Sequence, residues 1–591
     1  MIKLLKVENF KCIRKMSEPL KMAPLTILCG TNSSGKSTII QPLLLLKQSL
    51  NDGEKARIEL NGDHINLNNF ESIKSWGSED NFITFEFRLD DKVGCEVEFG
   101  YFPNMKKITE EDKEKPYLLN LKIFCDENIP SNTIYESPSD RIIFTRKKDK
   151  KNKLVEYELF IGEPDEENNI VNSGAFVFEN NFIGFLPDVN KPRSMLPIPC
   201  IIDDLSRILS TSRYQNEYVN AVENKQFLLN DSWGVKNIDM SRVIFSENER
   251  NITYGEYIEL LMKEFNNSDY KTSYFNLKDN GEKWLMIGYF IKKVKIDPKY
   301  KYLKIILIDI PFQELWKKYI EKINNFLNNF YFIGPLRKDP HVVSTENKTR
   351  SQVLPDGSNL PYYFFRNKTK KIEYIPNEYI NNNIFIDMNR EQDLIKKSVK
   401  KSLEDAVNDW VKYLGIAEKI KVEKINSIIK IIKVKPFNSN ENIEFNDLSG
   451  VSTGVSQVLP IIVQCLAADS GSTIFIQQPE LHLHPKVQSR LADFFIAMSL
   501  SGRQCIIETH SEHLINRLRL RTCQSLLNDN SIIKDNSMIY YFDKENTNTK
   551  VMPIEINEYA DYSIWPDGFF DEHQSNSDNI LDTINKKMFN D

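Results

Sequence analysis

The chain has 591 residues, of which 27% are charged and 41% hydrophobic, and its formal net charge is −6. These values are typical of a globular protein with roughly three to four domains of about 150 residues each. The acidic balance excludes a surface that grips nucleic acid everywhere, so any such contact needs a local basic patch. No apolar run approaches the ~20 residues of a membrane span. The eight cysteines include no Cys-x-x-Cys pair, which excludes a disulfide framework and predicts a reducing cytoplasm.

The first motif follows an N-terminal segment, residues 1–15, that alternates like a strand and lacks the apolar core of a signal peptide. Residues 25–40 read "LTILCGTNSSGKSTII". Residues 25–29 are strand-like, residues 30–37 fit the phosphate-loop pattern G-x-x-x-x-G-K-[ST], and a helix is expected from Thr38 onward. Pro42 falls inside that helix and is expected to kink it, because proline removes a backbone hydrogen bond.

Each residue type in this loop suits a bound triphosphate. Glycines let the loop curl so that its N–H groups face the β- and γ-phosphates, and Lys36 brings a positive charge to them. The Ser37 hydroxyl is a Mg²⁺ ligand, and the helix N-terminus adds its dipole. A chance match is the alternative, but the position between strand and helix favours a phosphate site. Its predicted residues are Gly30, Asn32, Ser33, Ser34, Gly35, Lys36, Ser37 and Thr38.

The middle of the chain shows two patterns. Short alternating aromatic segments within residues 81–187 predict strands, and residues 200–330 have a helical pattern. The basic run at 146–153 is either a nucleic-acid contact or, as we favour, a solvated hairpin tip. No stretch sustains heptads long enough for a long coiled coil, which predicts a compact accessory lobe.

Further regular elements are predicted downstream. Residues 391–415 are expected to form an amphipathic helix, and residues 418–437 and 537–556 are each expected to form a hairpin. At 447–467, "DLSGVSTGVSQVLPIIVQCLA", small residues precede an apolar helix and can present N–H and hydroxyl groups to an anion. Such loops are common, so this segment alone does not predict an anion site. Its position before the next motifs is what favours that interpretation.

Two strands with polar ends complete the pattern. The first, residues 473–476, ends in Gln477 and Gln478, and a helix with apolar residues at helical spacing starts near Pro485. The second, residues 505–507, ends in Glu508, Thr509 and His510. At the carboxyl end of such a strand a nucleotide enzyme needs one acid for Mg²⁺ and another to activate water.

The order of these motifs resembles the ATP-binding-cassette and SMC class of ATPases, and more closely the OLD-like ATPases of prokaryotic antiphage defence systems. The segments that carry the resemblance are "FKCI", "GTNSSGKSTIIQPLLLLKQS", "IELNGDHINLNNFESI", "YFIGPLR", "GVSQVLPIIVQ", "QPELHLHP", "ETHSEHLINRL" and "WPDGFFDE". They lie roughly within residues 1–90 and 330–575. The resemblance implies an α/β fold, an ATPase head with a mixed β-sheet and flanking helices, split by a long β-then-α insertion.

The resemblance also implies ATP and Mg²⁺ as cofactors and a homodimer or higher oligomer. In this class the signature turn of one subunit closes on the ATP of another, and His510 would be the switch histidine near the γ-phosphate. The residues that would form the signature turn are Ser452, Gly454, Ser456 and Gln457.

Two glutamines stand where acids are expected; Gln478 is within the family's habits, since relatives often have Glu-Gln-Pro-Glu here, whereas Gln477 is a departure. Gln477 falls where the family usually has its metal-binding acid, and Gln478 where cassette enzymes have the catalytic glutamate. A glutamine carbonyl can ligate Mg²⁺ without adding charge, and glutamine cannot act as a general base. The nearest acids in sequence are Glu480 and Glu508, and either can take over. We therefore expect ATP binding with slow hydrolysis, whether Gln477 is natural or an engineered substitution that traps ATP.

The predicted site residues follow from these two arguments. The predicted catalytic residues are Gln477, Gln478, Glu480 and His510, and the predicted metal ligands are Ser37 and Gln477. The four histidines of the last two motifs are His482, His484, His510 and His513. We favour hydrogen-bonded turn residues plus one phosphate sensor over a metal cluster, because no cysteine or third nearby ligand joins His482 and His484.

The predicted domains are 1–90 and 446–556 as the two parts of the ATPase head, 91–330 as the insertion lobe, 331–445 as a middle segment, and 557–591 as a tail. The predicted function is an ATPase subunit of an antiviral defence system that senses DNA or another invader cue and controls an effector encoded nearby, a nuclease or toxin. The alternatives are a DNA-repair or chromosome-maintenance ATPase of the RecF or SMC type, and a nucleotide-locked scaffold with little turnover.

Overall fold

The structure is a computed structural model, and part of the chain is described. The described residues are 1–51, 56–90, 92–101, 108–129, 139–146, 156–161, 175–178, 182–187, 194–197, 226–227, 238–239, 243–247, 250–253, 304–307, 313–338, 352–381, 398–425, 429–437, 445–448, 453–527, 530–545, 548–557, 559, 561–563 and 566. The basic run at 147–153, Ser452 and most of the tail from 557 onward lie outside them.

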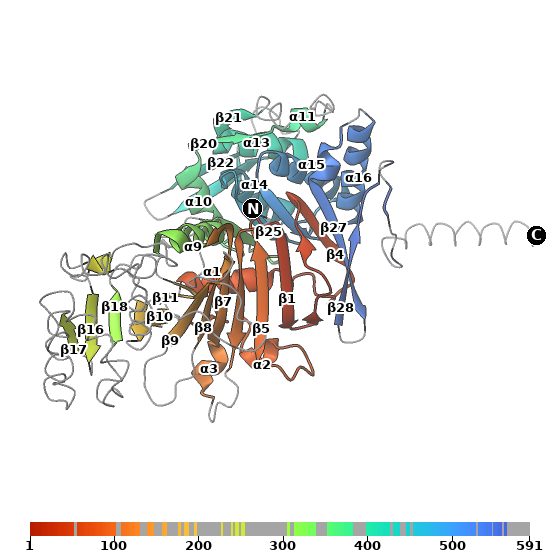
Figure 1. Ribbon diagram of the computed structural model, residues 1–591. Coiled ribbons are helices and arrows are strands. Elements are labelled where there is room, and N and C mark those ends of the chain that lie inside the picture. The colour runs from red at the N-terminus through yellow and green to blue at the C-terminus, as the bar shows by residue number, and fades with distance from the viewer. Residues whose placement is uncertain are drawn as a thin grey trace, which may run out of the picture.

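A large antiparallel sheet is built mainly from the N-terminal part of the chain (Figure 1). It has 13 strands in the order β17-β16-β18-β13-β10-β9-β8-β7-β6-β5-β1-β2, with β3 beside β1. Its strands are β1 (Leu4–Phe10), β2 (Ile13–Lys15), β3 (Leu20–Lys21), β5 (Phe82–Arg88), β6 (Gly94–Gly100), β7 (Tyr117–Ile129), β8 (Ser139–Arg146), β9 (Glu156–Ile161), β10 (Ala175–Phe178), β13 (Ser194–Pro197), β16 (Val243–Glu247), β17 (Arg250–Thr253) and β18 (Lys304–Leu307).

The strands predicted within 81–187 are confirmed, and β5 pairs with β1 on one side and β6 on the other. The predicted division at residue 90 therefore falls between two neighbouring strands of one sheet. Of the helical pattern predicted for 200–330, α9 (Gln313–Asn328) is confirmed, and the described residues between 226 and 307 are short strands. The other segments with a helical pattern, at 201–212 and 254–265, lie outside the described residues.

A second sheet joins distant parts of the chain. Its order is β19-β25-β26-β4-β27-β28, where the first five strands run parallel and β28 is antiparallel to β27. The strands are β4 (Leu25–Gly30), β19 (Phe330–Ile333), β25 (Thr473–Gln477), β26 (Gln504–Glu508), β27 (Ser537–Glu545) and β28 (Asn548–Ile554). This arrangement confirms the expected mixed sheet and places the phosphate-loop strand, β4, between two strands from the C-terminal part.

The parallel sheet separates two apolar cores, because its buried strands carry apolar side chains on both faces. One face, with Phe475 and Ile506, packs into a core shared with the antiparallel sheet, α1 (Gln41–Asn51) and α9. The other face, with Ile474 and Ile507, packs against a layer of helices (Figure 1). Those helices are α10 (Leu360–Asn367), α13 (Leu403–Leu414), α14 (Thr453–Ala467), α15 (Pro485–Leu500) and α16 (Glu512–Leu526).

Smaller elements connect these layers. The short helices are α2 (Phe70–Ile73), α3 (Glu110–Glu114), α11 (Asn377–Asn381) and α17 (Ile532–Asp535). The remaining strands are β11 (Phe182–Ile183), β12 (Leu186–Pro187), β14 (Gln226–Phe227), β15 (Ile238–Asp239), β20 (Lys371–Tyr374), β21 (Val399–Ser402), β22 (Lys419–Lys424), β23 (Lys430–Lys435) and β24 (Asn446–Asp447). Both predicted hairpins are confirmed as β22–β23 and β27–β28. Across the described residues, no helix is long and apolar enough to cross a bilayer.

Two helix starts differ from the predictions. The helix after the phosphate loop begins at Gln41, not Thr38, so Pro42 lies in its first turn. An N–H there has no intrahelical partner to lose, and the expected kink is therefore wrong. The helix predicted over 391–415 begins at Leu403, because Ser402 caps it by accepting from the Asp405 N–H, and residues 399–402 form β21 instead. Residues 391–397 lie outside the described part.

Candidate nucleotide-binding site

The phosphate loop follows the carboxyl end of β4, as predicted, and its backbone requires glycine. Gly30 has φ +128° and Gly35 has φ +100°, both in the left-handed region. A Cβ on Gly30 would lie 2.0 Å from the Phe542 carbonyl oxygen of β27. Only glycine can bring the loop this close to the neighbouring strand.

Lys36 is folded back on its own loop. Its Nζ donates hydrogen bonds to the carbonyl oxygens of Gly30 at 3.1 Å and Thr31 at 2.6 Å. Burial lowers the pKa of Lys36 below the ordinary lysine value, while the nearby carboxylates of Glu508 and Glu480 oppose that shift. The two hydrogen bonds keep the ammonium next to the loop backbone, within reach of any anion that the loop binds.

Glu508 joins the two predicted metal ligands. It ends β26, and its Oε1 accepts a hydrogen bond from the Ser37 hydroxyl at 2.7 Å. Its Oε2 accepts from the Gln477 side-chain amide at 2.8 Å. Gln477 ends β25 directly opposite Glu508 in the strand register. The carboxyl ends of neighbouring parallel strands thus bring Ser37 and Gln477 together around one carboxylate.

The predicted catalytic residues lie beside this cluster. Gln478 has φ +43°, and its N–H donates to the Glu508 carbonyl at 2.7 Å. Both Glu480 carboxylate oxygens are engaged, one by the Thr509 hydroxyl at 2.9 Å and one by the His510 N–H at 2.7 Å. Burial raises the pKa of Glu480, and these hydrogen bonds oppose the shift.

The His510 side chain is exposed. Burial of part of the ring and the charge of Lys36 lower the pKa of its imidazole. Because the pKa lies below the ordinary histidine value, the ring is neutral at neutral pH. A neutral imidazole can both donate and accept a hydrogen bond, which suits a group that senses a phosphate.

Arg337, which sequence reasoning gave no role, holds this region together. It follows β19, and its side chain is 5% exposed. The guanidinium donates to the carbonyl oxygens of Gln477 at 2.5 Å and Gln478 at 3.2 Å, and to that of Gln457 at 3.2 Å. Burial lowers the pKa of Arg337 to about 10, so it remains charged. The available signal was the segment "YFIGPLR", which Arg337 ends.

The predicted signature turn is partly corrected. The helix α14 begins at Thr453, so Gly454, Ser456 and Gln457 lie on the helix rather than in a turn before it. Ser456 and Gln457 are 2% and 8% exposed, and the Gln457 amide donates to the Arg337 carbonyl at 2.7 Å. Both side chains are therefore buried within this chain. Gly454 is half-buried.

The histidines of the "QPELHLHP" motif are turn residues. His484 caps α15, where its Nδ1 accepts from the Lys486 N–H at 3.2 Å, and His482 has φ +61°. Within the described ranges, no three His, Cys, Asp or Glu side chains converge in a way that could hold a metal. That finding still fits Mg²⁺, which is usually held by one or two carboxylates together with phosphate oxygens and water.

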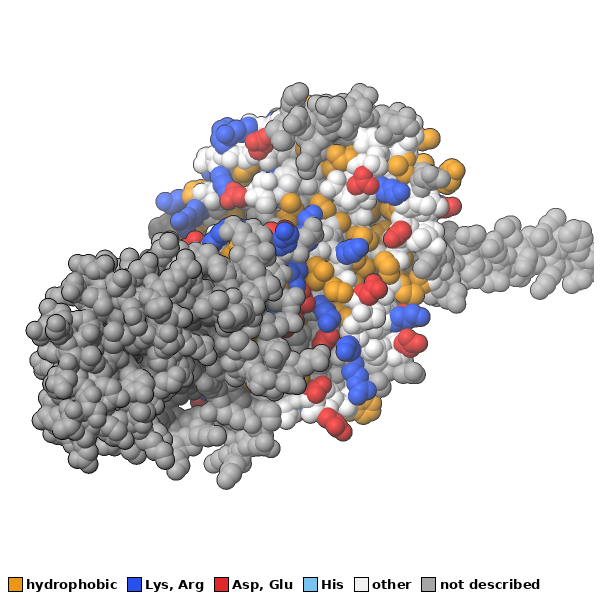
Figure 2. Space-filling view, viewed as in Figure 1, with side chains coloured by type: hydrophobic (Ala, Val, Ile, Leu, Met, Phe, Trp, Pro, Cys, Tyr) orange, Lys and Arg blue, Asp and Glu red, His pale blue; other side chains and the backbone are white. Residues whose placement is uncertain are grey.

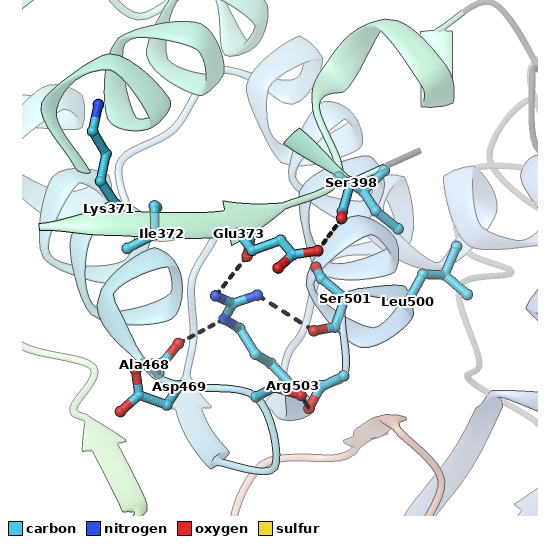
Figure 3. Close-up of a pocket in the computed structure, with 12 residues that line it drawn as sticks. Lys371, Ile372, Glu373, Ser398, Ala468, Asp469, Leu500, Ser501 and Arg503 are labelled. Carbon is cyan, nitrogen blue, oxygen red and sulfur yellow. Dashed lines mark hydrogen bonds between the residues drawn. The ribbon is translucent and has the colours of Figure 1, made fainter. Parts of the chain in front are cut away.

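A separate cavity of about 540 Å³ lies at the opposite end of the parallel sheet, lined by the loops that precede β25 and β26 and by β20 (Figure 3). Arg503 occupies its centre, and its guanidinium donates to the carbonyl oxygens of Ala468 at 2.8 Å and Glu373 at 3.0 Å. Because these hydrogen bonds go to backbone carbonyls, Arg503 acts there as a structural residue that closes the sheet end.

Comparisons with known proteins extend this description. Residues 532–579 match a family described as a protein of unknown function (DUF3696). A segment is 27% identical over 121 residues to the Old nuclease of Escherichia phage P2, and it covers 19% of this chain and 21% of that protein. The chain thus spans about a fifth of the length of this curated relative.

Solved structures with some likeness include two Smc head domains. The one from Pyrococcus furiosus, bound to the C-terminal domain of ScpA, has a TM-score of 0.31 at 12% identity, with 99% of each chain covered. The one from Pyrococcus yayanosii has a TM-score of 0.33 at 12% identity, with 95% of this chain and 98% of that chain covered. Residues 1–515 match the family described as AAA ATPase domain, and this chain therefore belongs to that family.

Proposed function

We propose that the chain binds ATP with Mg²⁺, hydrolyses it slowly, and serves as the OLD-like ATPase subunit of a prokaryotic antiviral defence system. The observation that carries the nucleotide part is the convergence of Lys36, Ser37 and Glu508 at the carboxyl ends of adjacent parallel strands. This is where α/β sheets bind phosphorylated ligands.

In this proposal the phosphate loop, residues 30–38, receives the triphosphate. Lys36 exchanges its hydrogen bonds to the loop carbonyls for bonds to phosphate oxygens, which carry full charge and so bind it more strongly. Ser37 and Gln477 lie on the side of the loop where Mg²⁺ would be held, and the ion would supply the positive charge that neutralises the phosphates. His510 is the proposed sensor of the γ-phosphate.

Slow hydrolysis follows from the state of the catalytic residues. Gln478 cannot take a proton from water. Glu480 is the nearest carboxyl to it in sequence, but both of its oxygens already accept hydrogen bonds from Thr509 and His510. Gln478 therefore supplies no base, and the Glu480 carboxylate is already engaged in orienting Thr509 and His510. These two observations also favour the second candidate, a nucleotide-locked scaffold.

The defence role rests on the similarity to the Old nuclease segment. By analogy, ATP would drive dimerisation, an invader cue such as DNA would set the state of the dimer, and an effector encoded nearby would act. Figure 2 shows one face of the molecule, where lysine, arginine and acidic side chains are interspersed over the described part. A DNA contact on this face would therefore depend on a few local positive charges rather than a continuous track.

The turnover proposal is tested with the purified chain and its Gln478→Glu variant. We expect calorimetry with ATP-γ-S to show binding by both proteins, and we expect the variant to hydrolyse ATP on the order of 10²-fold faster or more, because a positioned base is restored. Brisk hydrolysis by the natural chain, or equal rates in both, would contradict slow turnover by this cause.

The effector proposal is tested by co-purification with the products of the flanking genes. We expect a nuclease or toxin to be retained, with the amount depending on ATP and Mg²⁺. Retention of DNA-repair proteins instead would favour the RecF or SMC alternative.

A further inference from the structure

We infer that Glu508, on β26, is the carboxylate that holds Mg²⁺ beside Ser37, and that Gln477 positions Glu508 for this task. The inference rests on the proposed nucleotide function and names a metal ligand for it. The end of β25 has Gln477 where an acid is expected. Glu508 supplies that acid from β26, which lies one strand closer to the phosphate loop because the sheet order is β25-β26-β4.

The spacing of the oxygen atoms supports this assignment. Adjacent ligands of an octahedral Mg²⁺, each about 2.1 Å from the ion, lie about 3.0 Å apart. The Ser37 hydroxyl oxygen and Glu508 Oε1 are 2.7 Å apart. One ion could therefore be held by both oxygens with little movement of either side chain, once the Ser37 hydroxyl proton turns away from Glu508.

Gln477 fits a supporting role better than a ligand role. Its amide nitrogen donates to Glu508 Oε2 at 2.8 Å, which fixes the carboxylate plane and leaves Oε1 directed at Ser37. A glutamate at 477 would place a second carboxylate against Glu508, and like charges at that distance repel. The pair Gln477 and Glu508 thus keeps one negative charge at the site and holds it by a hydrogen bond.

The competing acid is already used elsewhere. Glu480 Oε1 accepts from the His510 N–H and Oε2 from the Thr509 hydroxyl, so it orients the segment that follows β26. Its contacts tie two strand ends together, whereas those of Glu508 reach the phosphate loop itself. Of the two acids, Glu508 is the one that touches a predicted metal ligand.

The test measures how much Mg²⁺ strengthens nucleotide binding, which is independent of turnover. ATP-γ-S is titrated into the chain in excess Mg²⁺ and in EDTA, and Mn²⁺ bound in the presence of ATP-γ-S is counted by electron paramagnetic resonance. We expect Mg²⁺ to tighten binding by about tenfold or more in the natural chain, and we expect Glu508→Gln to lose that gain and the bound Mn²⁺. The matched control is Glu512→Gln, four residues along on α16, where the side chain accepts from Asn516; it should keep both.

The exchange variant Gln477→Glu with Glu508→Gln guards against a folding defect, because it returns one carboxylate to the site. It should regain Mn²⁺ binding in part. If Glu508→Gln keeps the full Mg²⁺ effect, or if Glu480→Gln loses it while Glu508→Gln does not, the assignment of Glu508 is wrong. If the natural chain binds no nucleotide with or without Mg²⁺, the proposed function itself fails.

Discussion

Gly30 shows how a single residue type sets the geometry of the site. Its φ is +128°, and a methyl carbon added to it would lie only 2.0 Å from the Phe542 carbonyl oxygen, which leaves room for hydrogen alone. Phosphate-loop glycines are usually explained by the ligand, but here the neighbouring strand β27 imposes the same requirement. The loop is therefore held in shape by the protein itself, before any nucleotide binds.

We predict that Gly30→Ala lowers the free energy of unfolding by about 3 kcal/mol, because backbone atoms must move apart and the backbone is strained. Gly77→Ala is the matched control, since Gly77 also has a positive φ of +74° but has nothing within 4 Å of the added carbon. It should cost about 1 kcal/mol. Thermal unfolding midpoints of the two variants measure the difference; equal midpoints would show that β27 does not constrain the loop.

Two elements are joined by Arg337, whose buried guanidinium bonds the carbonyl oxygens that end β25 and one on α14. We predict that Arg337→Ala lowers the free energy of unfolding by about 3 kcal/mol and weakens nucleotide binding, because these carbonyls lose a charged donor. Arg366→Ala on α10, where the side chain is exposed, is the control and should change neither. Calorimetric titration with ATP-γ-S and thermal midpoints provide the measurement. An Arg337→Ala chain that binds nucleotide normally would contradict a positioning role.

The helix α1 meets β19 through a buried lysine. Lys47 Nζ donates to the Phe330 carbonyl and to Gln352 at 3.1 Å, and burial lowers the pKa of Lys47 to about 7. In the unfolded chain the pKa of a lysine is about 10.4. Between these two values the unfolded chain binds more protons, so the contribution of Lys47 to stability rises as the pH increases from about 7 toward 10.

We therefore predict that Lys47→Met flattens the pH dependence of the thermal midpoint between pH 7 and 9, relative to the natural chain. Lys113→Met on α3, where the side chain is 37% exposed, should leave that dependence unchanged. Parallel curves for the natural chain and Lys47→Met would show that Lys47 keeps an ordinary pKa in the fold.

Some of the strands and helices could be predicted from the sequence, and others could not. The strands β5 to β9 and both hairpins were predictable, because their side chains alternate and the fold uses that alternation. The starts of α1 and α14 were not, because small polar residues suit a turn and a helix N-terminus equally. The role of Glu508 was not predictable either, since it depends on β26 lying between β25 and β4, a fact of tertiary pairing.

At the scale of the whole molecule, fewer side chains remain that could contact the ATP of a second copy. Ser456 and Gln457 are occupied within the chain, which leaves Gly454 and the start of α14 to face a partner. We predict that light scattering shows a doubling of mass when ATP-γ-S and Mg²⁺ are added together. Lys36→Ala should stay at the mass of the unliganded protein, because it loses the charge that binds the phosphates.

An unchanged mass in saturating ATP-γ-S and Mg²⁺ would contradict ATP-driven dimerisation. If the natural chain and Lys36→Ala associate to the same extent, self-association is independent of the phosphate site. The variant Gly454→Ala tests the remaining surface: its added methyl group should weaken association while leaving nucleotide affinity in the single chain unchanged.

The position of β4 has a consequence for how this protein is made. Its neighbours in the sheet are β26 and β27, and residues Leu25 to Leu28 pair with residues 505–508 on one side and 537–540 on the other. During synthesis the phosphate loop leaves the ribosome early but must wait for nearly the whole polypeptide before its flanking strands exist. A truncated or prematurely terminated product therefore lacks the two strands that flank β4, and the phosphate loop of such a product is not held in its sheet.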